Sequence, residues 1–218
     1  MLDWNFIIEH IFFFKDAIIL TFKISFFGIV LALIIGFVCA LLISFKKIFF
    51  LSKIIEFYVE FARNTPLLIQ LFFLYFALPK IGIKISPESC AIIGLAFLGG
   101  GYMCESFRLG LQSVGKAQIE SALSIGLNPI GLIVYVVIPQ ALSVALPSIG
   151  ANVIFLVKET SVVGILALAD VLYVSKDIIN VYGKTYEALF MLLLAYLVIL
   201  LPLSILFSVL EKNMRKKL

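Results

Sequence analysis

Ionisable side chains stand inside segments of this chain that are otherwise long and apolar. Glu60 and Arg63, and likewise Glu105 and Arg108, are three residues apart, the separation at which side chains on a helix meet. We interpret Glu60, Arg63 and Arg108 as members of structural ion pairs that hold neighbouring helices. Glu105 lies deeper in its segment and could face a polar pathway, because an uncompensated charge at the bilayer centre costs about 2.5–3.5 kcal/mol.

A second polar group follows another long apolar run, at Lys158, Glu159, Thr160 and Ser161. Adjacent side chains on a helix do not face each other, so Lys158 and Glu159 cannot simply pair. A zwitterionic solute needs an anion for its ammonium group and donors for its carboxylate. Glu159 with Glu105 could supply the first, and Ser161 or Lys158 the second. A role in gating or helix packing is the alternative.

Other patterns argue against chemistry on this chain. Gly110–Ala117 misses the phosphate-binding loop G-x-x-x-x-G-K-[ST] by one residue: Ala117 has no hydroxyl for Mg²⁺, and an apolar helix precedes the segment instead of a strand. Three cysteines without CxxC spacing and a single histidine leave little material for a metal site or a catalytic triad. We therefore expect this chain to bind neither a nucleotide nor a metal and to have no catalytic residues.

Composition sets the class of protein. Of 218 residues, 63% are hydrophobic and 14% charged, against about 25% charged in a soluble domain. No ten-residue alternation typical of a transmembrane barrel is present. The sequence predicts an all-α polytopic membrane protein with one transmembrane domain over residues 1–218, and the net charge of +4 requires no nucleic acid.

Apolar runs of about 20 residues predict five membrane spans, at residues 24–45, about 54–79, 87–107, 141–165 and 188–210, with a start before Lys23 as the alternative for the first. Residues 129–138 are assigned to a helix on the membrane surface, 166–184 to external short helices, and Pro202 to a kink. Gly99, Gly100 and Gly101 predict close backbone contact with a neighbouring helix. If the fourth helix begins at Pro147, Lys158 lies near mid-bilayer; if it begins at Pro139, Lys158 lies at the outer rim.

The polar stretch of about residues 112–138 does not resemble a span. Apolar and small residues from Ala117 to Gly126 recur at helical spacing between polar ones, which predicts a short amphipathic helix. Gly126 should end it, and Asn128 with Pro129 should cap the next helix. An embedded chain that presents a capped helix to water points to a soluble partner.

The lysines and arginines predict the orientation. Five spans put the termini on opposite sides, and the side richer in basic residues faces the cytoplasm. The N-terminus is then outside, and the C-terminus and the 112–128 helix are cytoplasmic. The richer side holds Lys46, Lys47, Lys53, Arg63, Arg108, Lys116, Lys212, Arg215, Lys216 and Lys217; the other holds Lys15, Lys80, Lys84, Lys176 and Lys184.

The chain resembles the permease subunits of ABC importers for polar amino acids, of the histidine, glutamine and arginine type. The coupling motif of that family matches Glu120-Ser121-Ala122, followed by Gly126 and by Ile138-Pro139. The similarity runs from about Thr21 to the last span. Further matches lie at residues 58–73, 105–108, 139–142 and 158–161.

The resemblance implies the fold of a type I ABC importer permease in a bacterial inner membrane. It implies that Glu120, Ser121, Ala122 and Gly126 form a coupling helix that binds a cytoplasmic ATPase. The implied partners are ATP-binding subunits that hold ATP and Mg²⁺, a second permease subunit of the same or a similar chain, and an extracytoplasmic solute-binding protein. The implied substrate is an amino acid.

Several departures and alternatives accompany this interpretation. Ser121 replaces the usual alanine, Gly115 and Ala117 replace a proline and a glycine, and Glu159 replaces an aspartate. A stand-alone ion-coupled transporter or channel would need no coupling helix. A related ABC permease for phosphate or sulfur compounds is a closer alternative, and a membrane-embedded enzyme would want histidines or paired carboxylates at the interface.

Overall fold

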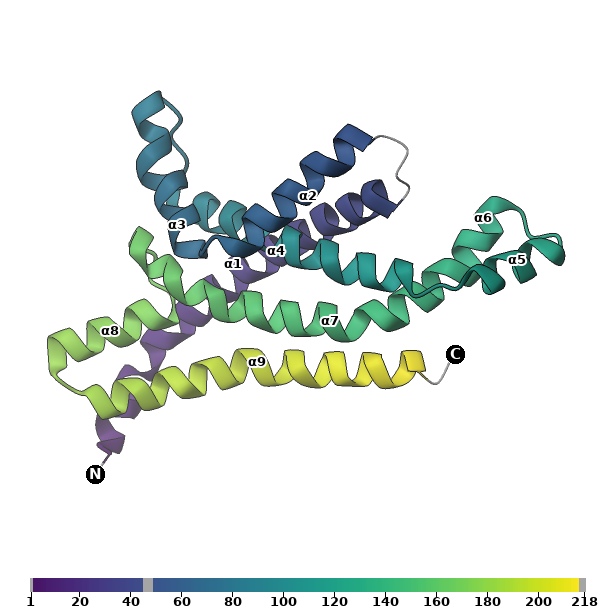
Figure 1. The fold of residues 1–218 in the computed structure, drawn as a ribbon. Coiled ribbons are helices and arrows are strands. Elements are labelled where there is room, and N and C mark those ends of the chain that lie inside the picture. Colours follow the sequence, from purple (N-terminus) through teal and green to yellow (C-terminus); the bar gives the residue numbers. More distant parts are fainter. Residues whose placement is uncertain (1, 45–48, 216–218) are drawn as a thin grey trace. The chain divides into compact units, whose positions relative to one another are not determined.

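The computed structural model describes residues 2–44 and 49–215, and within them it contains helices and no strand (Figure 1). The predicted all-α class is confirmed. The α-helices are α1 (Trp4–Ser44), α2 (Phe49–Asn64), α3 (Leu67–Phe72), α4 (Pro87–Gln112), α5 (Lys116–Ser124), α6 (Pro129–Leu132), α7 (Ile138–Glu159), α8 (Val171–Tyr182) and α9 (Thr185–Arg215).

Long apolar helices account for the spans. By length and composition, four helical stretches of the described residues could cross a membrane, and α2 with α3 makes a fifth if that broken pair is one span. α1 begins at Trp4, which confirms the alternative start of the first span before Lys23; Lys23 pairs with Glu88 at 2.5 Å and does not end the helix. The predicted end of the third span at residue 107 is wrong, because α4 continues to Gln112. The predicted stop at Lys46 and Lys47, like Lys216 and Lys217, lies outside the described residues.

The predicted surface helix at 129–138 is also wrong, because helical structure continues from Pro129 to Leu166. Pro139 does not break it. A π-helical segment, Ile133–Val137, ends two residues before Pro139, and a second one, Phe73–Ala77, ends two residues before Pro79. Proline lacks the N–H of the regular ladder and crowds the preceding turn, and a widened turn relieves both problems. Pro147 lies inside α7, so the alternative in which the fourth helix begins there is wrong.

The second predicted span is interrupted. α2 ends at Asn64 and α3 begins at Leu67, with Pro66 at the N-cap in an extended conformation. The residue before a proline is pushed away from helical angles, which explains the break at Thr65. Further along, residues 166–184, predicted to be external short helices, contain one α-helix, α8, that Asp170 caps and Gly183 ends with φ +66°. α9 is continuous, with Pro202 inside it.

The described chain forms two compact units. The first unit contains α1 as far as Val30, Thr65–Ala96 and Ile154–Leu203. Its core is apolar side chains from the start of α1, from α8 and from the first half of α9. Figure 1 shows α8 folding back along the first turns of α9, where the Ser175 hydroxyl donates to the Ala188 carbonyl over 3.1 Å.

The second unit contains the rest of α1, α2, Phe97–Val153 and the end of α9. A Cβ on Gly100 would overlap Tyr58 and Ile35, and one on Gly101 would lie 3.2 Å from Ala62. These two glycines therefore let α4 approach α1 and α2 closely, which confirms the predicted role of the glycine run at these positions. The Tyr58 hydroxyl donates to the Phe97 carbonyl at 2.8 Å and holds the same contact.

Candidate functional site

The polar helix α5 is built by local sequence. At its start the Gly115 N–H donates to the Gln118 side chain over 3.2 Å. At its end Gly126 has φ +85°, its N–H donates to the Leu123 carbonyl at 3.0 Å, and the Leu127 N–H donates to the Ala122 carbonyl at 3.2 Å. This pair of bonds is the Schellman motif, which needs a left-handed residue and so favours glycine. The predicted role of Gly126 as a helix stop is confirmed.

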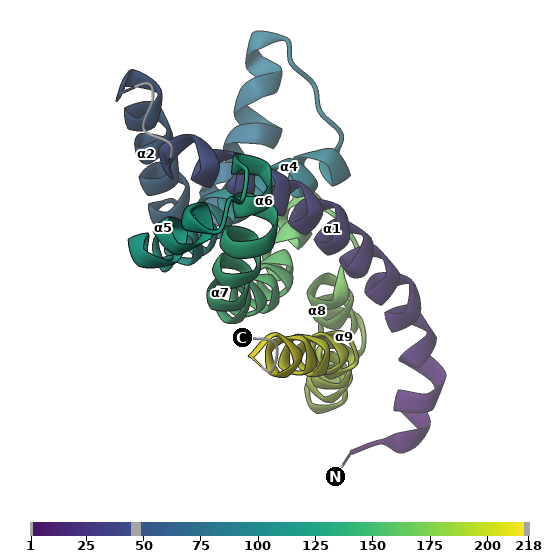
Figure 2. The ribbon, with the colours of Figure 1, turned by 90° about the vertical axis from the view of Figure 1, so that its right-hand side faces the viewer.

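The next helix starts as predicted. The Asn128 Oδ1 accepts from the Gly131 N–H at 2.7 Å, and Pro129 occupies the first helical position, where its missing N–H costs nothing. α5 and α6 lie beside each other as the turn of a hairpin between α4 and α7 (Figure 2). The sequence between Gln112 and Ile138 therefore folds into a compact tip.

The tip presents a concave surface. A cavity of about 450 Å³ is lined from both sides of the hairpin by Ala117, Gln118, Ser121, Ala122, Ile125, Leu127, Val136 and Gln140. Among the expected coupling residues, Glu120, Ser121 and Gly126 are exposed while Ala122 is buried against the hairpin. Sequence reasoning missed the exposed apolar side chains beside them, since Ile125 is 79% and Ile130 73% exposed. Apolar side chains on an otherwise polar turn are the signal that could have found them.

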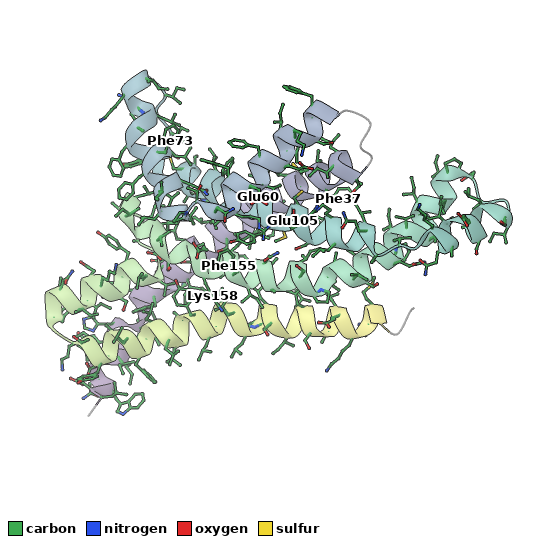
Figure 3. The ribbon with its side chains drawn as sticks, in the orientation of Figure 1. Phe37, Glu60, Phe73, Glu105, Phe155 and Lys158 are labelled. Atoms are coloured by element: carbon green, nitrogen blue, oxygen red, sulfur yellow. The ribbon has the colours of Figure 1, made fainter. Side chains whose placement is uncertain are left out.

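Of the two expected ion pairs, Glu105–Arg108 is formed among the described residues and Glu60–Arg63 is not. Arg108 Nη2 lies 2.6 Å from Glu105 Oε2, and both side chains are partly buried. The expected Glu60–Arg63 ion pair is absent from the described residues. Glu60 instead accepts from the Asn64 amide at 3.1 Å, and the Arg63 guanidinium lies 5.3 Å from the centre of the Tyr102 ring. An aromatic face and a neighbouring amide replaced the expected partners. Figure 3 labels Glu60 on α2 and Glu105 on α4, both in the second unit.

The group at the end of α7 belongs to the first unit. Lys158, labelled in Figure 3, is exposed, Glu159 is partly buried, and Thr160 is fully buried with its hydroxyl donating to the Val157 carbonyl at 2.7 Å. Ser161 lines a cavity of about 490 Å³. The other lining residues are Leu68, Val162, Gly164, Ile165, Leu172, Tyr173, Lys176, Asp177 and Asn180. Of the four substrate candidates, Lys158, Glu159 and Ser161 are thus close in the chain, and Glu105 lies in the other unit.

Asp170 is not a solvated loop charge. Its side chain is fully buried and caps α8 by accepting from the Tyr173 N–H at 3.0 Å and the Leu172 N–H at 3.3 Å. Burial raises the pKa of Asp170 to about 6, although these backbone donors and Lys176 act in the opposite direction. The exposed Lys176 and Asp177 instead line the cavity beside Ser161.

Comparison with known proteins identifies the family. The family described as "binding-protein-dependent transport system inner membrane component" matches residues 12–216. The chain belongs to this family. It is a multi-pass inner membrane permease, the translocation subunit of an ATP-binding cassette importer, and ATP hydrolysis takes place on a separate subunit.

Two relatives come from Bacillus subtilis. The permease is 37% identical to the probable glutamine ABC transporter permease protein GlnP, over 79% of the permease and 78% of GlnP. It is 31% identical to the probable amino-acid permease protein YxeN, over 99% of the permease and 97% of YxeN. The similarity thus covers almost the whole permease.

Solved structures share its fold. A chain in the crystal structure of an amino acid ABC transporter with histidines matches with a TM-score of 0.87 and 29% identity, covering 98% of the permease and 99% of that chain. A chain of the MetNI methionine ABC transporter matches with a TM-score of 0.77, 16% identity and coverage of 93% and 96%. The second likeness concerns the fold alone. The predicted fold of a type I importer permease is confirmed.

Proposed function

We propose that this permease imports a polar amino acid, driven by an ATPase that binds the α5–α6 tip. The observation that carries the proposal is the tip itself: a Schellman-terminated helix whose exposed Glu120, Ser121 and Gly126 border a concave surface. A membrane-embedded chain gains nothing from such a surface unless a water-soluble partner covers it. The names of the relatives support an amino acid as the substrate.

The tip has the features that a protein partner recognises. Ser121 and Gly126 allow close approach, Glu120 can accept hydrogen bonds from a basic or hydroxyl group, and Ile125 can fill an apolar pocket. An alternative resting place on lipid headgroups is disfavoured, because interfacial helices that bind anionic membranes carry basic polar faces, whereas α5 carries Glu120 and one lysine, Lys116. ATP and Mg²⁺ would be held by the partner.

The remaining parts follow from this assignment. The distribution of the basic residues favours a cytoplasmic position for α5, the α9 end and the C-terminus, with the start of α1 outside. A second permease subunit of the same or a similar chain completes the pathway, and a solute-binding protein delivers the amino acid on the outer side. We assign substrate contact to Glu105, Lys158, Glu159 and Ser161. Helical structure from Pro129 to Leu166 supports the alternative in which Lys158 lies at the outer rim.

Reconstitution tests the proposal. The permease is purified with its ATPase and placed in liposomes, and uptake of labelled glutamine, histidine and arginine is measured with the solute-binding protein outside and ATP at the tip side. Uptake should require both ATP and the ATPase. Accumulation by the permease alone, driven by a proton or sodium gradient, would instead establish an ion-coupled secondary transporter.

A matched pair of variants tests the tip. Gly126 and Gly82 both have positive φ, +85° and +89°, and both have open space where a Cβ would lie. Gly126→Asp should leave the permease inserted and the ATPase active but remove uptake, because it places a charge on the docking surface. Gly82→Asp should retain uptake. Full uptake by Gly126→Asp would show that the tip is not the coupling surface.

A further inference from the structure

A line of polar contacts joins α4 and α7 within the second unit. Ser106 on α4 is 1% exposed, and its Oγ lies 2.8 Å from Ser148 Oγ on α7. The Asn152 amide donates to the same Ser106 Oγ at 2.9 Å and to the Tyr102 carbonyl at 3.4 Å. Ser106 also donates to the Tyr102 carbonyl at 3.1 Å. Its hydroxyl then makes one donated and two accepted bonds, which is its full capacity.

The contact continues toward the tip through small residues. A Cβ on Gly110 would overlap the Ala141 carbonyl and lie 2.9 Å from the Ala145 Cβ. Tyr102, Ser106 and Gly110 are four residues apart and share one face of α4. The residues opposite them on α7 run in the reverse order, as expected for the two antiparallel arms of a hairpin. We call these residues the α4–α7 seam: Tyr102, Ser106, Gly110, Ala141, Ala145, Ser148 and Asn152.

Such a seam fixes two helices more firmly than apolar packing alone. Small residues allow backbone contact, and hydrogen bonds between membrane helices add to that packing. Separating the arms would also leave the Asn152 amide without these partners in an apolar surrounding. Sliding by one turn would break the three bonds between the helices together, those from Ser106 to Ser148 and from Asn152 to Ser106 and to Tyr102.

We propose that the α4–α7 seam makes the two arms of the tip hairpin move as one rigid body during transport. α4 ends at Gln112, four residues before α5, and α7 continues from α6 through the π segment, so both arms connect directly to the tip. A displacement of α5 then moves both arms instead of spreading them. This inference rests on the proposed coupling of α5 to an ATPase. It makes Ser106 and Asn152 positioning residues that touch neither substrate nor nucleotide.

Loosening the seam tests the proposal through the number of amino acids imported per ATP hydrolysed. The probe is whichever of labelled glutamine, histidine and arginine gives the highest uptake with the unmodified complex. The double variant Ser106→Ala with Asn152→Leu should retain ATP hydrolysis and lower that ratio at least fivefold. The single variant Ser106→Thr, which keeps the hydroxyl, should have the ratio of the unmodified complex. Ser143→Ala is the control, because the one bond that the Ser143 hydroxyl makes within residues 2–44 and 49–215 goes to the Gln140 carbonyl of its own helix. An unchanged ratio in the loosened variant would overturn the proposal.

Locking the seam gives a second test that does not depend on the stability of the loosened variant. Cysteines replace Ser106 and Ser148, whose Oγ atoms lie 2.8 Å apart, in a chain whose Cys39, Cys90 and Cys104 are changed to alanine. Oxidation would join the two sulfurs over about 2.05 Å. The oxidised protein should import within twofold of the cysteine-free chain that keeps Ser106 and Ser148, since a rigid body loses nothing by being locked. Arrest of uptake on oxidation, reversed by reductant, would show that the seam opens in the cycle.

The control that separates the two proposals is the unmodified complex. If it imports without its ATPase, or if Gly126→Asp imports normally, then the coupling function is wrong, whatever the seam variants do. If the unmodified complex requires ATP and Gly126→Asp is inactive, the seam results bear on the rigid body alone.

Discussion

Lys184 Nζ lies 2.8 Å from Asp3 Oδ2, which ties the start of α1 to the turn between α8 and α9. The Asp3 N–H also donates to Glu187 Oε1 at 2.9 Å. The Lys184 side chain lowers the pKa of Asp3, and Asp3 in turn raises the pKa of Lys184. The pair is exposed to solvent, so it fixes geometry more than it adds stability.

The first prediction concerns this tie. Asp3→Asn and Lys184→Met should each accelerate hydrogen exchange at the Phe6 and Ile7 amides by less than about fivefold, because exposed pairs are weak. Because the pKa of Asp3 is lowered, the tie is present above that pKa and is lost as pH falls through it. The double variant should exchange no faster than either single one. Additive effects would show that the two side chains act independently.

The second prediction concerns Asp170 and pH. Its folded pKa of about 6 exceeds the usual 3.8, so the folded state binds the proton more tightly than the unfolded chain. Its contribution to stability is full below about pH 4 and falls as pH rises to about 6, by up to about 3 kcal/mol for two pKa units. Asp170→Asn keeps a good N-cap and removes the titration.

Thermal unfolding in detergent checks it. The melting temperature of the wild type relative to Asp170→Asn should drop between pH 4 and pH 7, while Asp177→Asn, at an exposed carboxylate, should parallel the wild type. Equal pH profiles for the wild type and Asp170→Asn would contradict the assignment of the raised pKa to burial.

The third prediction concerns packing at Gly110. A methyl group there would overlap the backbone of Ala141, which cannot move without shifting α7. Gly110→Ala should therefore destabilise the protein by about 1–3 kcal/mol, the usual cost of overpacking. Gly115→Ala is the control, because the nearest atom to its new Cβ is the Gln118 Oε1 at 3.9 Å. Similar melting temperatures for the two variants would mean that α4 and α7 are less tightly packed.

The fourth prediction concerns Glu159. If its carboxylate contacts the ammonium group of the substrate, Glu159→Gln should raise the apparent KM for the preferred amino acid at least tenfold, because one charge-assisted hydrogen bond contributes about 1.5–3 kcal/mol. The exposed Lys158 provides the comparison. If Ser161 donates to the carboxylate of the substrate, Lys158→Met should alter uptake less than Glu159→Gln does. Wild-type affinity and selectivity in Glu159→Gln would remove it from the substrate site.

Local signals in the sequence predicted the tip correctly. Gly126 and Asn128 act through bonds to residues no more than five positions away, so their roles can be inferred from the chain alone. Hydropathy likewise predicted the helical class and the last span. Each of these features depends on neighbours in the sequence or on composition.

Features that depend on distant partners were missed. Lys23 could remain inside a helix because Glu88, far along the chain, neutralises it. Arg63 found the Tyr102 ring instead of Glu60. Asn152 and Ser148 are polar residues in an uncharged run of the sequence. Their partner Ser106 could not be inferred without knowing how α4 and α7 align. A break at Pro139 was predicted, wrongly, because the sequence gives no signal for the π segment that lets the helix continue past this proline.

That π segment sets the phase of α7. A π turn holds one residue more than the regular ladder needs, and each residue of an α-helix turns the chain by about 100°. Deleting one residue from Ile133–Val137 would let the helix wind regularly and rotate everything beyond it by about that angle. Ser148 and Asn152 would then point away from α4. The angular position of all of α7 thus depends on one extra residue in the π segment before it.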